Sequence, residues 1–187
     1  MKHEVFEKEL KFITSDDIRE FTVRALDKLP DYFYSIPASS TGKYHPDYAL
    51  GYGGLVRHVK ATIYIALELF KMEKYAYKQR EQSMILSVLL LHDGHKNGRG
   101  DSKYTDTRHP LIQAESILED GELMAILPEN DIHSICDLIS THMGQWDSDF
   151  KTGKKELPRP ESVHQEFVHL CDYIASRKCL EFNFEVV

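Results

Sequence analysis

Apolar residues recur at helical spacing along almost the whole chain, and this pattern predicts an all-α fold. Pro30 ends the first periodic run, Pro110 stands in the first turn of the fourth, and Gly121 closes that run. The run at 78–91 is apolar on nearly every side in its later half, so we expect it to be central. The chain ends on EFNFEVV, whose alternation is compatible with a short strand or an extended tail. Helices are therefore expected over residues 14–29, 54–72, 78–91, 110–121, 130–142 and 161–179.

Three polar segments separate these helices, at residues 31–52, 92–108 and 143–160. Irregular segments of this length are uncommon in a compact domain and are usually either functional or disordered. The chain shows no internal repeat, low-complexity tract or interdomain linker. We therefore expect one compact helical bundle over residues 1–187, with long loops around an active site.

Composition narrows the class of protein. The 187 residues include 23 Lys and Arg against 30 Asp and Glu, a formal net charge of −7, which disfavours an extended surface for coating nucleic acid. A local basic pocket can still bind phosphate. No apolar run reaches the roughly 18 residues of a membrane span, and the N-terminus lacks a signal-peptide core. Three cysteines without a CxxC pair fit a reducing compartment, so we expect a cytoplasmic protein without membrane contact.

The candidate chemistry begins with His92 and Asp93, which close the apolar run SVLLLHD. Successive residues of a regular helix point about 100° apart, but at a helix end followed by Gly94 both can turn toward one ion. Imidazole nitrogen and carboxylate oxygen are ligands for divalent metals such as Zn, Mn or Fe. For an isolated dipeptide, a histidine that compensates the helix dipole and a turn-forming aspartate would be the alternative.

Three more residues support a metal site. His58 and His142 lie beside apolar positions of predicted helices, and Asp172 lies within the apolar segment LCDYIASR. A buried carboxylate without a partner costs several kcal/mol, so Asp172 needs a cation or a firm hydrogen-bond partner. A metal ion would supply it.

In their order along the chain these residues resemble the HD-domain superfamily of metal-dependent phosphohydrolases. The segment YHPDYALGYGGLVRHVK (44–60) resembles the HH-x-Y-x-GGL-x-x-H segment of HD-domain 3′–5′ exoribonucleases, and LLLHDGHK (89–96) keeps the apolar-HDxxK form. The segment TRHPLIQAESIL (107–118) resembles the third-histidine helix of HD-GYP phosphodiesterases. THMGQWD (141–147) and LCDYIASR (170–177) resemble the histidine turn and the closing aspartate helix. The resemblance covers about residues 40–180, which would form the core of the domain.

The resemblance implies a ligand set. His58, His92, Asp93 and Asp172 would bind a primary metal ion. His109 and His142 would hold a second, bridged to the first by Asp93; a capping role for His109 and a helix-end role for His142 are the alternatives. The resemblance also implies catalytic roles for Asp93 and Lys96, with Lys96 balancing phosphate charge or assisting proton transfer. The expected cofactor is one or two divalent ions drawn from Mn, Fe, Co, Ni, Zn and Mg.

The resulting expectation is a phosphohydrolase that uses a metal-activated hydroxide to cleave a nucleotide-type phosphoester. Six ligands favour phosphodiester cleavage, in a short oligonucleotide or a cyclic nucleotide. A one-metal (deoxy)nucleoside phosphate phosphohydrolase and a non-catalytic nucleotide-binding module are the alternatives. Either a monomer or an oligomer is compatible with the sequence. Lys43, Arg99, Lys103 and Trp146 are the candidate substrate-binding residues, Trp146 through stacking on a base or through packing alone.

Overall fold

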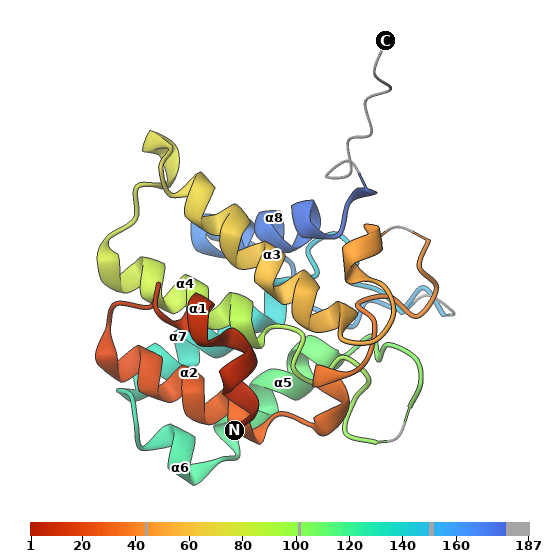
Figure 1. The fold of residues 1–187 in the computed structure, drawn as a ribbon, viewed down its shortest axis with the longest axis horizontal. Coiled ribbons are helices and arrows are strands. Elements are labelled where there is room, and N and C mark those ends of the chain that lie inside the picture. Colours follow the sequence, from red (N-terminus) through yellow and green to blue (C-terminus); the bar gives the residue numbers. More distant parts are fainter. Residues whose placement is uncertain (44, 101, 150–151, 179–187) are drawn as a thin grey trace.

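The computed structural model describes residues 1–43, 45–100, 102–149 and 152–178, and in that part of the chain it is helical, without a sheet (Figure 1). The all-α fold predicted from the hydrophobic pattern is confirmed. Short 3-10 turns, labelled η, connect several helices, and one isolated bridge joins Ser148 to Lys155. The elements are η1 (Lys2–Phe6), α1 (Glu7–Leu10), α2 (Asp16–Lys28), η2 (Asp31–Tyr34), η3 (Asp47–Ala49), α3 (Gly54–Leu69), η4 (Glu73–Tyr75), α4 (Gln79–Leu91), α5 (His109–Leu118), α6 (Gly121–Met124), α7 (Glu129–Thr141) and α8 (Val163–Ala175).

Helix α4 is the centre of the bundle, as its apolar run predicts. It packs against α2, α3, α7 and α8, and residues 85–91 are all buried. Its one polar residue in that stretch, Ser87, accepts a hydrogen bond of 2.7 Å from the hydroxyl of Thr22 on α2. Because His92 and Asp93 follow directly on α4, the position of this helix places both of them inside the protein.

The helices around α4 pack mainly in two pairs, α3 with α8 and α5 with α7 (Figure 1). The loop at residues 35–53 lies close against the start of α3, where a Cβ on Gly54 would come within 2.3 Å of the carbonyl oxygen of Ala49. Only glycine leaves room for that approach. The same loop is tied to the end of α8, because the Tyr48 hydroxyl donates a hydrogen bond of 2.8 Å to the carbonyl of Ala175.

Some predicted helix boundaries are wrong. The helix expected to run to Gly121 ends at Leu118, and Gly121 begins the separate helix α6. The reason is Asp120, whose side chain accepts hydrogen bonds from two backbone N–H groups of α6 and so starts a new helix. Helix α8 ends at Ala175 rather than at residue 179. The predicted strand or tail at 181–187 lies outside the described residues.

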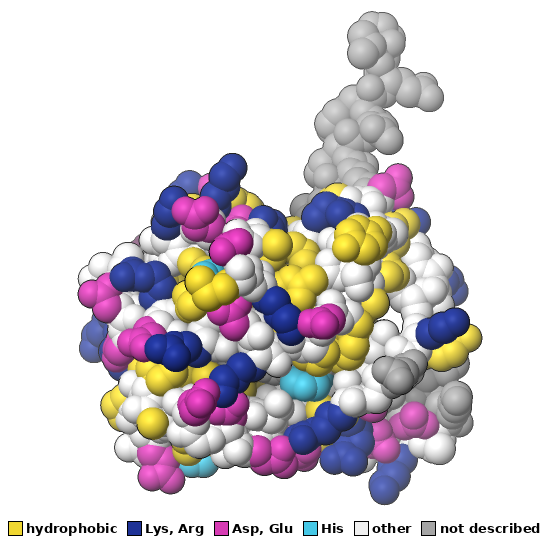
Figure 2. Space-filling view, turned by 60° about the horizontal axis from the view of Figure 1, so that its bottom comes forward, with side chains coloured by type: hydrophobic (Ala, Val, Ile, Leu, Met, Phe, Trp, Pro, Cys, Tyr) yellow, Lys and Arg dark blue, Asp and Glu magenta, His cyan; other side chains and the backbone are white. Residues whose placement is uncertain are grey.

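The surface offers two further observations. None of the helices in the described ranges combines the length and the hydropathy that a bilayer span requires. On the face shown in Figure 2, Lys and Arg side chains alternate with Asp and Glu side chains rather than forming one continuous basic area.

Candidate metal centre

The structure brings all six residues of the expected ligand set together at the ends and inner faces of five helices. Five of these side chains are at most 1% exposed, and the sixth, that of Asp172, is 18% exposed. Their ligand atoms form three overlapping groups of three, within which all atoms lie within 4.8 Å of one another. The residues are His58 on α3, His92 and Asp93 after α4, His109 at the start of α5, His142 after α7, and Asp172 on α8.

Asp93 is the centre of this cluster. Its Oδ1 lies 2.9 Å from Nε2 of His109 and 3.6 Å from Nε2 of His142. Its Oδ2 lies 3.6 Å from Nε2 of His92 and 3.9 Å from Nε2 of His58. The two oxygens of one carboxylate therefore face two different pairs of histidines.

Asp172 has the partners that its position on a buried helix requires. Its Oδ1 lies 2.9 Å from Nε2 of His58 and 3.7 Å from Nε2 of His92. Burial opposes ionisation of Asp172, but its hydrogen bond with His58 and the nearby His92 imidazole outweigh burial and hold its pKa well below the ordinary value.

Three of the imidazole rings are oriented by the backbone of the preceding turn. Each donates Nδ1–H to a carbonyl three residues earlier: His92 to Leu89 (2.8 Å), His109 to Asp106 (2.7 Å) and His142 to Ile139 (2.8 Å). A neutral ring that donates from Nδ1 keeps a lone pair on Nε2. The Nε2 atoms of His109 and His142 lie only 3.2 Å apart, and the buried Nε2 of His92 has no hydrogen-bond partner in the described chain. In their neutral form these rings direct Nε2 lone pairs toward one another, an arrangement that a cation would satisfy.

The donor set and its spacing fit a divalent metal ion. Metal–ligand distances of about 2.0–2.1 Å place tetrahedral ligand atoms about 3.4 Å apart. The nitrogen–oxygen separations in the cluster range from 2.9 to 3.9 Å. Neutral imidazole and carboxylate together suit first-row divalent ions. These buried residues can therefore hold a metal ion.

Lys96 is the nearest positive charge. Its Nζ lies 2.9 Å from Oδ1 and 2.8 Å from Oδ2 of Asp93, and its side chain is 12% exposed. Burial works against ionisation of Asp93, but the charges of Lys96 and His92 and the nearby imidazoles of His109 and His142 outweigh it. The pKa of Asp93 therefore lies well below its ordinary value.

Two histidines of the cluster titrate in opposite directions. Burial lowers the pKa of His142 to about 4, and its hydrogen bond with Asp93 offsets this only in part. Burial also acts to lower the pKa of His92, but the charges of Asp93 and Asp172 outweigh it and the pKa is raised. The His142 ring is consequently neutral near pH 7, the form in which imidazole binds metal.

A seventh residue, His45, lies beside the cluster and was given no role by the sequence analysis. It belongs to the loop at 35–53, and its ring centre lies 5.5 Å from that of His58, with the ring planes 64° apart. Burial lowers the pKa of His45 to about 4. The only signal in the sequence is its place in the segment 44–60, which resembles a motif containing paired histidines.

The expected cationic substrate-binding residues lie on two loops, the one before α3 and the one between α4 and α5. Arg99 forms an ion pair of 2.8 Å with Glu119 at the end of α5, on the surface. Lys103 is exposed and lines a cavity of about 390 Å³ together with Asn97, the residue after Lys96. Lys43 is exposed in the loop at 35–53. Their role in binding substrate stays a prediction.

Trp146 is part of an exposed aromatic stack. Its ring is 40% exposed and lies nearly parallel to that of Tyr173, with centres 5.6 Å apart and planes at 15°. The guanidinium of Arg177 lies 4.6 Å from the centre of the Tyr173 ring and 5.4 Å from that of Trp146. Tyr173 directly follows Asp172 on α8, so this ring of the stack and the ligand Asp172 belong to the same turn of the helix.

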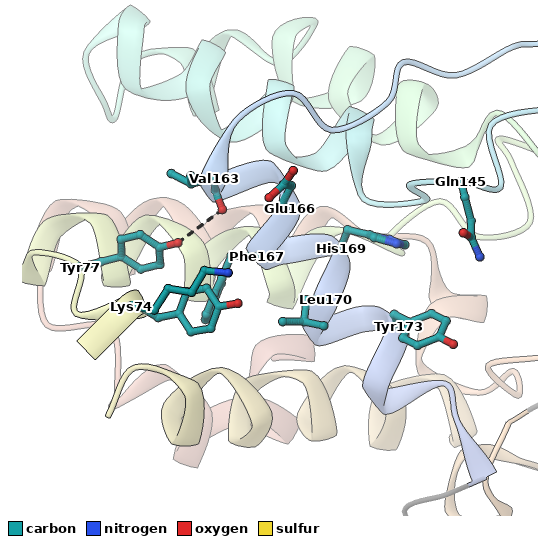
Figure 3. Close-up of a pocket in the computed structure, with 10 residues that line it drawn as sticks. Lys74, Tyr77, Gln145, Val163, Glu166, Phe167, His169, Leu170 and Tyr173 are labelled. Carbon is teal, nitrogen blue, oxygen red and sulfur yellow. Dashed lines mark hydrogen bonds between the residues drawn. The ribbon is translucent and has the colours of Figure 1, made fainter. Parts of the chain in front are cut away.

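A cavity of about 500 Å³ runs along the outer side of α8 (Figure 3). At one end the Tyr77 hydroxyl donates a hydrogen bond of 3.4 Å to the carbonyl of Val163, and at the other lie His169 and Tyr173. None of the six clustered residues lines this cavity, but one hydrogen bond links its wall to the cluster. His169 donates from Nδ1 to the carbonyl of His142, at 2.8 Å.

Comparison with known proteins identified no relative of this chain. The search with protein-family models found no match to this chain, and neither did the searches of curated proteins and of solved structures.

Proposed function

We propose that the chain is a metal-dependent phosphohydrolase of the HD-domain type, acting on a nucleotide-type phosphoester. The observation that carries the proposal is the arrangement at Asp93, where each carboxylate oxygen faces its own histidine pair. The resemblance in motif order, from His58 to Asp172, supports the same conclusion.

The chemistry follows from a metal ion and from the residues around it. A divalent ion lowers the pKa of water to about 7 and withdraws charge from phosphoryl oxygens. Lys96 adds an ammonium group beside Asp93, and we assign it the role of balancing the negative charge of a bound phosphate. Asp172 and Lys96 are more exposed than the histidines, so a phosphoryl group would approach between them. Burial raises the pKa of Cys171, which keeps this thiol protonated and makes it a poor nucleophile.

A phosphodiester is the favoured substrate. Because Asp93 is shared by two histidine pairs, the cluster offers two metal positions, and two ions can stabilise both the attacking and the leaving oxygen. A short oligonucleotide or a cyclic nucleotide has the required bond. One observation favours a second candidate, the one-metal nucleotide phosphohydrolase: Lys96 contacts both oxygens of Asp93 and already neutralises its charge.

The test is a phosphoester panel on protein shown to be metal-free after treatment with a chelator. The panel holds a chromogenic diester and monoester, short oligonucleotides, and (deoxy)nucleoside mono- and triphosphates. Each is assayed with Mn, Fe, Co, Ni, Zn or Mg. We expect turnover only with added metal, and diester cleavage above monoester cleavage. Turnover by metal-free protein would refute metal dependence, and metal binding without turnover of any ester would leave a nucleotide-binding module.

Metal stoichiometry separates the two candidates. His142→Gln removes one ligand at the end of α7, while His133→Gln alters an exposed histidine of the same helix and serves as the control. A two-metal centre predicts a fall from about two ions per chain toward one in His142→Gln alone, with loss of diester cleavage. A constant value of about one ion in all three proteins would select the mononucleotide phosphohydrolase.

A further inference from the structure

One of the four clustered histidines lacks the support that the other three have. His92, His109 and His142 each place Nδ1 against a backbone carbonyl of the preceding turn. The Nδ1 of His58 is buried and has no hydrogen-bond partner among the residues that the structure describes. When Nε2 of a histidine binds a metal, Nδ1 carries the proton and needs an acceptor, which fixes the direction of the ring.

His45 is the residue placed to provide that acceptor. Its own Nδ1 is also buried without a hydrogen-bond partner in the described ranges. The two ring centres are 5.5 Å apart. Since an imidazole nitrogen lies about 1.1 Å from its ring centre, a turn of the rings can bring two nitrogens as close as about 3.3 Å, near the length of a hydrogen bond. Two unsatisfied buried nitrogens on adjacent rings therefore have each other as the available partner.

The loop that carries His45 is held in place from two sides. Tyr48 bonds to the end of α8, and the backbone N–H of Ala38 donates a hydrogen bond of 3.0 Å to the carbonyl of Ala49. The close approach of Ala49 to Gly54 fixes the same loop against the start of α3, the helix of His58. The position of the His45 ring is thus set by the fold and not by the local chain alone.

We infer that His45 is a positioning residue: its imidazole accepts the Nδ1–H of His58 and so aims Nε2 of His58 at the metal. The inference rests on the metal centre of the proposed function. The orientation of the His58 ring, and with it the metal position at His58, then depends on the loop at 35–53. The orientations of the other three rings depend on their own preceding turns. Outer partners of metal-binding histidines typically change metal affinity 10- to 100-fold.

The test uses two substitutions of opposite design and cobalt(II) as the probe. His45→Phe keeps a ring of similar shape but has no acceptor, and His45→Asn keeps an acceptor on a shorter side chain. Cobalt affinity, stoichiometry and the visible absorption spectrum, which reports ligand geometry, are measured on metal-free protein. Exposed His133→Phe is the control, and circular dichroism checks the fold.

We expect His45→Phe to bind cobalt at one position 10- to 100-fold more weakly and with an altered spectrum. His45→Asn should recover part of the affinity, and the control should match the wild type. If His45→Phe does not fold, His45→Ala must show the same loss. Unchanged affinity and spectrum would overturn the inference, as would lower turnover with unchanged affinity, since that result places His45 on the substrate. Wild-type protein that binds no cobalt would overturn the metal centre itself, which distinguishes the two failures.

Discussion

Gly144, two residues after the cluster histidine His142, is the most informative single position to perturb. Its φ is +59°, and a Cβ there would lie 2.3–2.5 Å from three atoms of the His169 ring. Gly51 offers a matched control, because its φ is +66° but a Cβ there would meet no atom within 4 Å. The pair separates backbone strain from the steric effect of the close approach.

The two substitutions should lower the free energy of unfolding by different amounts. A left-handed backbone costs an L-residue about 1–2 kcal/mol, a penalty that Gly51→Ala and Gly144→Ala share. Overpacking adds about 1–3 kcal/mol, and it applies at Gly144 alone. The free energy of unfolding should therefore fall by about 1–2 kcal/mol in Gly51→Ala and by about 2–5 kcal/mol in Gly144→Ala.

Urea denaturation followed by circular dichroism measures both values, with chelator present so that metal binding does not contribute. A second readout is metal affinity. Displacement of His169 removes its hydrogen bond to the carbonyl of His142, so Gly144→Ala alone should bind metal more weakly. Equal losses of stability in the two variants would refute the close approach of His169 to Gly144.

Three other outcomes are expected. Lys96→Ala should destabilise the metal-free protein by about 3–5 kcal/mol, because it leaves a buried carboxylate without its ammonium partner. The variant should keep its metal while losing turnover. Thermal denaturation with and without metal, together with metal analysis, checks both expectations, and loss of metal would make Lys96 a structural residue. Burial holds the pKa of His45 and His142 at about 4, so in metal-free protein the unfolded chain takes up protons below pH 6.5 that the folded chain does not. The free energy of unfolding should then fall as the pH falls from 6.5 toward 4, by at most about 1.4 kcal/mol per pH unit for each ring. The raised pKa of His92 offsets part of this fall, because the stability that His92 contributes is present at low pH and is lost as the pH rises. A higher urea midpoint at pH 5 than at pH 7 would contradict the reasoning. Trp146→Ala should raise KM for a nucleotide substrate about 5- to 150-fold with kcat unchanged, if the ring stacks on the base. An unchanged KM would show that the ring only packs.

The helices could be predicted because amphipathic periodicity is a local property of the chain. Helix α4 is the clearest case, since a run apolar on nearly every side has to be buried. The first and last residues of the helices were less predictable, because side-chain hydrogen bonds decide where a helix begins and ends. Gly121 was interpreted as a stop signal, but the carboxylate of Asp120 caps the N–H groups that follow and turns the same glycine into a helix start.

The six clustered residues were chosen from motif order, and the structure brings them together. Spacing along the chain could not show which atoms meet, for example that the two oxygens of Asp93 face different histidine pairs. His45 was missed for a related reason. Its approach to His58 depends on how the loop is held by Tyr48, and no local pattern encodes that contact. The surface ion pair of Arg99 was equally invisible from sequence.

The near-complete burial of the cluster has a consequence for how a bound ion would exchange. Five of the six side chains are at most 1% exposed, and the sixth, that of Asp172, is 18% exposed. An ion held there would leave at a rate set by opening of the protein rather than by the concentration of chelator. The metal found in a purified sample would then record the ion that was present when the chain folded. Its natural metal has to be assigned by refolding the chain in competing ions, not by analysing the protein as isolated.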